Sequence, residues 1–167
     1  EDYETDIWNR YLHGEFFNAD SIHLADSVEY FTKNGRVVYS GGGIMPDIFV
    51  PRDTSDITPY FTKLVNKALI YKFALKYTEA HRAELKQYTD WQSLNAHLNT
   101  LGLFDQLVDY AAKEDVTGSN TDKRISNKLI NEHINSYIVR NILGDEGFYP
   151  LTYSTDETVL EALKKIE

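Results

Sequence analysis

The chain has 167 residues, of which 42% are hydrophobic, enough for one domain with a buried core or for a domain and a fragment of another. Its net charge is −9 and its 17 basic residues are scattered among 26 acidic ones, which argues against nucleic acid or an anionic membrane surface as a partner. It contains no cysteine, which excludes disulfides and thiol chemistry, and no apolar run approaches the roughly 18 residues of a transmembrane helix.

A short helix is predicted near the N-terminus. Its apolar positions have helical spacing and are Ile7, Trp8, Tyr11 and Leu12. We expect it to end at His13-Gly14. The aromatic residues Trp8, Tyr11, Phe16 and Phe17 lie in a segment too short to bury them, so we expect them to dock against something outside this chain. The acidic start, without Met or the regions of a signal peptide, is interpreted as that of a processed or excised product.

A β-hairpin is predicted over residues 28–40. Asn34-Gly35 is typical of a two-residue type I′ turn, because both residues accept a positive φ. A further short strand, including Ile44-Met45 and residues 48–50, is expected to end at Pro51. If these strands form an orphaned edge, we expect the strand around residues 37–39 to pair with a second copy, to swap between chains or to be poorly ordered.

Three consecutive glycines, Gly41 to Gly43, separate the two β-rich runs. The stretch lacks the Lys-Ser/Thr of a P-loop and the G-x-G-x-x-G spacing of a dinucleotide turn. The Pro46-Asp47 pair that follows also does not open a helix where a phosphate would need one. We therefore expect a close backbone approach or a bend at this stretch, and no nucleotide.

Helices are predicted throughout the chain beyond residue 51. Apolar residues recur with a period of 3.6 over residues 57–87, with Pro59 in the first turn. The further predicted helices are 91–101, capped by Asp90 and closed by Gly102; 103–113; a long one that stops at Gly144; and a last one opened by the capping-box spacing of Ser154 to Glu157. We expect a mainly α protein with a small β part (α+β), in which an N-terminal β-hairpin and strand segment precedes a bundle of four or five helices.

The histidines give no metal motif. They are His13, His23, His81, His97 and His133. No two of them are three or four residues apart, and no HExxH-type motif occurs, so metal ligation would require residues distant in sequence to converge. We interpret them as surface or core histidines.

The carboxylates and serines likewise give no catalytic constellation. Asp105 and Asp109 lie one turn apart, a spacing that in an acidic protein indicates a solvated helix face. Ser126 precedes Lys128, and Ser136 precedes Arg140, on an ordinary amphipathic helix where nothing indicates the buried, neutral amine of a Ser–Lys pair. We assign no catalytic, cofactor-binding or metal-binding residue and expect no cofactor.

Residues 34–54, NGRVVYSGGGIMPDIFVPRDT, resemble the end of the protease domain of C-terminal processing peptidases, the tail-specific serine proteases, especially those of Bacteroidetes type. The matching residues are Gly35, Arg36, Val38, Tyr39, Gly41, Gly42, Gly43, Ile44, Pro46 and Asp47. The preceding RYLHGEFFNADSI resembles the linker just upstream in such members, and the helical remainder resembles their C-terminal extension in layout. One departure is Ser40, which stands where a fourth glycine is expected.

The resemblance implies a parent enzyme with a Ser–Lys dyad and a PDZ-like binder of substrate tails, both upstream of this motif and neither present here. Residues 1–50 would then be the C-terminal edge of the protease domain, and residues 51–167 a helical C-terminal domain. The fragment is expected to be inactive by itself and to have a structural, substrate-cleft or dimerisation role.

The expected partners are the upstream domains of the parent chain, its protein or peptide substrate and a second copy of this chain. The implied location is the periplasm or the cell envelope. The alternative is an independent helical interaction module that carries a glycine-rich hairpin. A small hydrolase using scattered His and Asp residues has no supporting constellation.

Overall fold

The computed structural model describes residues 3–18, 21, 29–35, 37–39 and 48–166 of the chain. It divides into two compact units, residues 1–53 and residues 54–167. The first unit contains helix α1 (Tyr3–Leu12) and strands β1 (Glu29–Phe31) and β2 (Val37–Tyr39). The predicted N-terminal helix is thus confirmed, and it ends where expected, because Gly14 has a φ of +80°.

The predicted hairpin is also confirmed, but its turn differs from the prediction. Strands β1 and β2 pair antiparallel, with Tyr30 opposite Val38 and Phe31 opposite Val37. Gly35 has a φ of +77°, whereas Asn34 is not among the described residues with a positive φ. A type I′ turn needs a positive φ at both positions, and here the strands end farther apart, at Phe31 and Val37. The Gly35 amide donates instead to the Thr32 carbonyl at 2.9 Å.

The predicted third strand is not present over residues 48–50, which are the part of it that the structure describes. Residues 48–50 are described and are not in a strand, so that part of the prediction is wrong. An extended segment becomes a strand only when a neighbour takes up its backbone hydrogen bonds, and the sheet of the described residues holds β1 and β2 alone. The three glycines, with Ile44-Met45 and Pro46-Asp47, lie outside the described residues.

The second unit is helical. Its helices are α2 (Pro59–Asn66), α3 (Leu69–Leu85), α4 (Trp91–Leu98), α5 (Leu103–Lys113), α6 (Asn120–Leu143), α7 (Asp145–Tyr153) and α8 (Glu157–Ile166). The predicted class, mainly α with a small β part, is confirmed. The predicted number of four or five helices is too low for the described residues 54–166, because one predicted helix is broken and another was not foreseen.

The break separates α2 from α3. Ala68 adopts a left-handed conformation with φ 53° and ψ 31°, which costs a non-glycine residue about 1–2 kcal/mol. Burial on both sides of the break offsets this cost, since Leu64 of α2 and Leu69 of α3 are fully buried. The apolar residues keep their period of 3.6 through the break. This period therefore predicts helical structure over residues 57–87, but it does not indicate that the segment is divided into two helices.

The ends of the next helices agree closely with the expected signals. Asp90 caps α4 by accepting from the Ser93 amide at 2.8 Å, and this helix ends three residues before the predicted Leu101. Helix α5 has the predicted bounds, and Gly144 caps the C-terminal end of α6. The capping box expected from Ser154 to Glu157 is wrong: Ser154 is the C-cap of α7, and Asp156 caps α8 by accepting from the Thr158 and Val159 amides.

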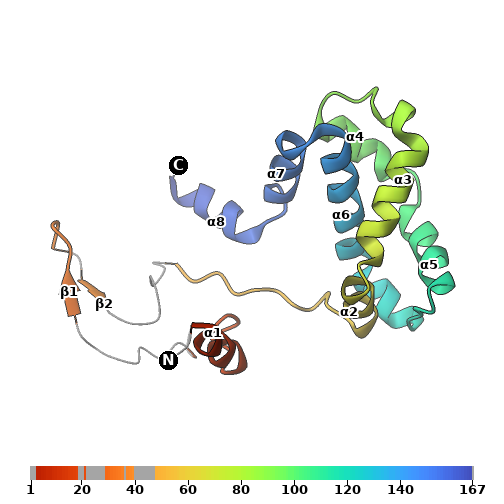
Figure 1. The fold of residues 1–167 in the computed structure, drawn as a ribbon. Helices are drawn as coiled ribbons and strands as arrows, with labels where there is room; N and C mark the ends of the chain where they lie inside the picture. The colour runs from red at the N-terminus through yellow and green to blue at the C-terminus, as the bar shows by residue number, and fades with distance from the viewer. Residues whose placement is uncertain (1–2, 19–20, 22–28, 36, 40–47, 167) are drawn as a thin grey trace. The chain divides into compact units, whose positions relative to one another are not determined.

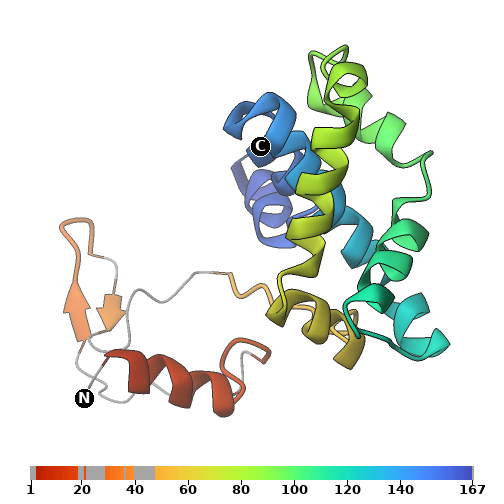
Figure 2. The same ribbon diagram turned by 45° about the vertical axis from the view of Figure 1, so that its right-hand side comes forward.

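Helix α6 is the centre of the second unit, and Figures 1 and 2 show α3 and α7 beside it. It packs against α2, α3, α4, α5 and α7. Its buried apolar residues are Ile130, Ile134, Ile138 and Val139. The start of α2 is fastened to it: the hydroxyls of Thr58 and Ser126 lie 2.7 Å apart, and Ser126 donates to the Asp56 carbonyl at 2.6 Å.

Helix α8 differs from the other helices of the second unit because none of its residues is buried. Leu160, Leu163 and Ile166 are exposed, which leaves an apolar face of this amphipathic helix uncovered within the described residues. Among those residues, no helix combines the length and hydropathy needed to cross a membrane.

Candidate functional site

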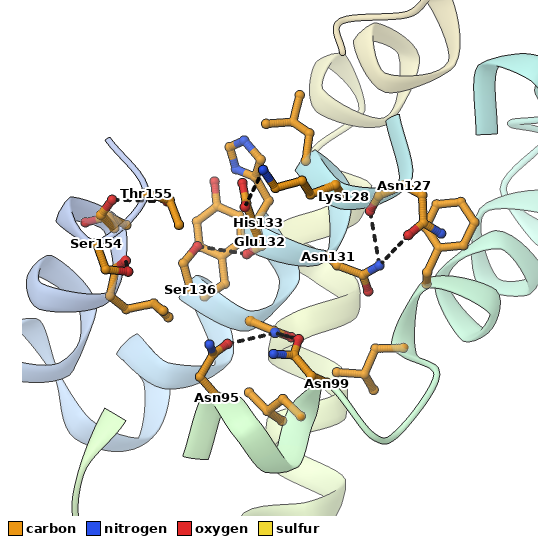
Figure 3. A pocket seen from close by; sticks show the side chains of 18 of the residues that line it. Asn95, Asn99, Asn127, Lys128, Asn131, Glu132, His133, Ser136, Ser154 and Thr155 are labelled. Atoms are coloured by element: carbon orange, nitrogen blue, oxygen red, sulfur yellow. Dashed lines mark hydrogen bonds and ion pairs between the residues drawn. The ribbon is translucent and has the colours of Figure 1, made fainter. Parts of the chain in front are cut away.

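The second unit contains a pocket of about 760 Å³ (Figure 3). Its walls come from α4, the start of α5, α6, α7 and the segment between α7 and α8. This volume lies in the range of about 300–1,000 Å³ that is typical of small-molecule and cofactor sites. All lining residues belong to residues 95–155, so the pocket is a property of the second unit by itself.

The most distinctive side chains of this pocket are five asparagines: Asn95, Asn99, Asn127, Asn131 and Asn135. Asn95 of α4 and Asn99 at its C-cap are four residues apart, as are the successive asparagines of α6, so each set follows one face of its helix. Tertiary packing of α4 against α6 brings the two sets together.

Hydrogen bonds order these carboxamides (Figure 3). The Asn135 amide nitrogen donates to Asn95 Oδ1 at 2.9 Å and to Asn99 Oδ1 at 2.8 Å. The Asn131 amide nitrogen donates to Asn127 Oδ1 at 3.0 Å and to the Asn127 carbonyl at 3.1 Å. Asn135 is only 4% exposed, so its two bonds satisfy a polar group that would be costly to bury alone.

Removing the central carboxamide is expected to destabilise the second unit. Asn135→Ala deletes both bonds and leaves a small void, and we expect a loss of about 1–3 kcal/mol in the free energy of unfolding, measured by urea denaturation. Asn66→Ala, an exposed change on α2 away from the pocket, is the matched control and should stay within about 0.5 kcal/mol of the parent chain. Equal stability of the two variants would contradict the structural role of Asn135.

Charges at the pocket are few and mostly negative. Lys128 lies 4.0 Å from Glu132, one helical turn away, and is 80% exposed. Asp105 adds a second carboxylate to the lining, and Lys128 is the only lysine or arginine among the described residues that line the pocket. The pocket therefore suits a neutral polar group better than a phosphate or a carboxylate.

His133 is a half-buried titratable residue of the pocket. Its ring lies 5.5 Å from the ring of Phe61 and 6.3 Å from that of Tyr137. Burial against these neighbours lowers the pKa of the imidazole from its ordinary value of 6.5, because desolvation disfavours the charged form.

This shift predicts a pH dependence of stability. At pH values well above 6.5 the imidazole is neutral in both the folded and the unfolded state, and its titration has no effect on folding. As the pH falls below 6.5, the unfolded chain takes up the proton first, so the free energy of unfolding falls until the folded pKa is passed. We expect chemical denaturation to show a smaller loss between neutral and acidic pH for His133→Gln than for the parent chain. Identical pH profiles would contradict this assignment.

Two histidines that the sequence left separate converge in the structure. His81 Nδ1 lies 3.7 Å from Glu84 Oε2, and His97 Nε2 lies 3.3 Å from Glu84 Oε1. Their rings stack on Tyr77 and Tyr88, respectively. Among the described residues no group of three or more His, Cys, Asp or Glu side chains is arranged so that it could hold a metal ion, and this cluster is interpreted as packing.

The serines and aspartates considered as catalytic candidates from the sequence are either hydrogen-bonded within the fold or exposed on its surface. The Ser126 hydroxyl is tied to Thr58 and to the Asp56 carbonyl, and Ser136 donates to the His133 carbonyl at 3.0 Å. Asp105 and Asp109 are exposed, and Asp105 lines the pocket. Sequence reasoning missed the pocket asparagines. Their spacing of four residues was the available signal, but it does not reveal that the two helices meet.

Comparison with known protein families shows a match to part of the chain. The model of a family of unknown function, DUF8443, matches residues 60–144, about half of the chain. This range includes α3 to α6 and all five pocket asparagines. Neither a curated protein nor a solved structure matches the chain.

Proposed function

The chain belongs to the family of unknown function DUF8443, and we propose that it is the C-terminal part of a tail-specific serine endopeptidase, non-catalytic by itself. Residues 1–50 would complete the edge of a protease domain. Residues 51–167 would be its helical C-terminal domain, with a substrate-binding or bracing role.

The main observation that supports this proposal is the exposed apolar hairpin of β1 and β2. Tyr30 pairs with Val38 on one face and Phe31 pairs with Val37 on the other, so both faces of the two strands are apolar. All four side chains are exposed, and Phe31 is 67% exposed. A two-stranded hairpin is marginally stable in water, and apolar residues on both faces are typical of a sheet covered on both sides. These strands therefore suit a larger sheet, as the resemblance of residues 34–54 to a protease domain implies.

Helix α1 supports the same interpretation. Trp8 is 59% exposed, and Tyr11 and Phe16 are also exposed. These rings contact one another, with Trp8 and Tyr11 stacked at 5.8 Å, but the described residues do not bury them. A further covering layer would remove this apolar surface from water.

The deciding experiment is the recovery of the natural product from its source. An antibody against residues 54–167 would isolate it, and its intact mass and N-terminal sequence would be measured. We expect a polypeptide well above 19.3 kDa, in the envelope fraction, with a serine and a lysine upstream in peptidase context. Its cleavage of peptide tails should vanish on replacement of that serine by alanine, and the 167-residue chain should show no peptidase activity.

A different function is favoured if that experiment yields a chain of about 19.3 kDa without upstream peptidase residues. The second candidate is an independent helical interaction module. The separate core of residues 54–167 and the uncovered apolar face of α8 favour it. Its expected signature is a well-folded chain with the hairpin buried by its own residues or by a second copy, which hydrogen exchange and analytical ultracentrifugation would detect.

A further inference from the structure

We propose that the pocket of the second unit binds an extended peptide segment, whose backbone is held by the pocket asparagines. This inference goes beyond the proposed parent protease, because every residue that carries it lies within residues 54–167. It holds whether the peptide belongs to a protease substrate or to a partner protein.

The first argument is chemical. A carboxamide presents one acceptor and a donor group, as a peptide group does, and so can bond a peptide backbone without reading its side chains. The amide nitrogen of Asn135 donates to the side-chain oxygens of Asn95 and Asn99. The amide nitrogens of Asn95 and Asn99 themselves donate to no other side chain in the described part of the chain. The oxygen of Asn135 likewise has no hydrogen bond to a described residue. Unused donors and an acceptor thus line one pocket.

The second argument is geometric. Asn127, Asn131 and Asn135 recur every four residues, which corresponds to about 6 Å along a helix. The backbone groups of an extended peptide that point to one side recur every two residues, or about 6.6–6.8 Å. Over the three asparagines the two repeats drift apart by roughly 1–2 Å. The row of carboxamides therefore matches an extended strand.

The third argument is the charge of the pocket. Glu132 and Asp105 would repel a terminal carboxylate or a phosphate, and the lining cation, Lys128, is paired with Glu132. The pocket thus favours the interior of a peptide over its C-terminal end.

A sugar is the other neutral ligand with many hydroxyl donors and acceptors, and the aromatic rings disfavour it. A sugar ring commonly packs on an open aromatic face. Here Tyr137 meets the ring of Tyr71 at 5.5 Å and 86°, and Arg140 lies over Phe148 at 4.8 Å. Both rings already contact other side chains, whereas the amide nitrogens of Asn95 and Asn99 have no hydrogen bond to a described residue.

The test is a titration of the ¹⁵N-labelled 167-residue chain with a blocked neutral hexapeptide, acetyl-Ala-Ser-Ala-Thr-Ala-Ser-amide, followed by NMR. The side-chain amide signals of the pocket asparagines should shift together, and those of Asn66 and Asn120 should not. A weak Kd of about 1 mM is expected for so short a probe. Absence of shifts at saturating solubility would overturn the proposal.

Variants and matched probes locate the interaction. Asn99→Ala combined with Asn127→Ala should weaken binding about tenfold, while Asn66→Ala binds as the parent does. Both substitutions leave the hydrogen bond from Asn131 to the Asn127 carbonyl intact, and thermal unfolding checks that the double variant is folded. The same hexapeptide methylated on alternate backbone nitrogens should bind more weakly. Equal binding by the methylated peptide, or tighter binding of chitotriose, would contradict backbone recognition.

Discussion

Ile134→Ala is expected to destabilise the second unit by about 3–4 kcal/mol, because the side chain lies in the middle of the central helix and is fully buried. Helix α6 packs against five other helices, so the void cannot collapse by moving one neighbour. In a unit of this size the loss corresponds to a fall in Tm of about 10–15 °C, measured by circular dichroism.

The matched control is Ile125→Ala on the same helix. Ile125 is 39% exposed, so the same chemical change removes a side chain that is already partly in water. Its cost should remain below about 1 kcal/mol. If the two variants lose equal stability, α6 is not the centre of the core.

Gly118→Ala is expected to be the second strongly destabilising change. An added Cβ would lie 2.5 Å from Cγ and Cδ2 of Tyr60 and 2.7 Å from its Cβ. Tyr60 is 1% exposed, so its ring is surrounded by other protein atoms and cannot move away into solvent. The loop or α2 must shift, and we expect a cost of about 1–3 kcal/mol in the free energy of unfolding by urea.

A double-mutant cycle identifies this cause. In a Tyr60→Leu background the ring is gone, so Gly118→Ala should cost less than about 0.5 kcal/mol. The Tyr60→Leu change itself costs stability, but the cycle compares only the effect of the added methyl group. An undiminished cost in that background would mean that the backbone of Gly118, and not the ring, opposes the substitution.

The local signals in the sequence determined most of the secondary structure. Helix α5 has the predicted bounds because Gly102 and Lys113 enclose a strongly amphipathic segment whose ends need no distant partner. Asp90 and Gly144 act as caps because each contacts backbone groups only a few residues away. The hairpin follows from β-branched and aromatic residues on either side of Gly35.

Helix α7 was not predicted, because two of its residues carry the opposite signal. Gly147 and Pro150 are typical helix breakers, yet both lie inside Asp145–Tyr153. A Cβ on Gly147 would lie 2.8 Å from the Cβ of Leu143 and 2.9 Å from Cγ1 of Val139. Glycine is thus required at this position because α7 lies close to α6. No local pattern in the sequence indicates this contact.

The left-handed Ala68 and the pocket also depend on the tertiary structure. Alanine is the strongest helix former, so the residue type at position 68 predicts no break between α2 and α3. The break is required by the burial of both helices against α6. Asn95 and Asn135 are 40 residues apart and meet only because α4 packs on α6. The sequence by itself therefore determined the helices, their caps and the hairpin, whose hydrogen bonds span a few residues. The tertiary structure decided the break at Ala68, helix α7 and the asparagine-lined pocket, because these depend on contacts between distant segments.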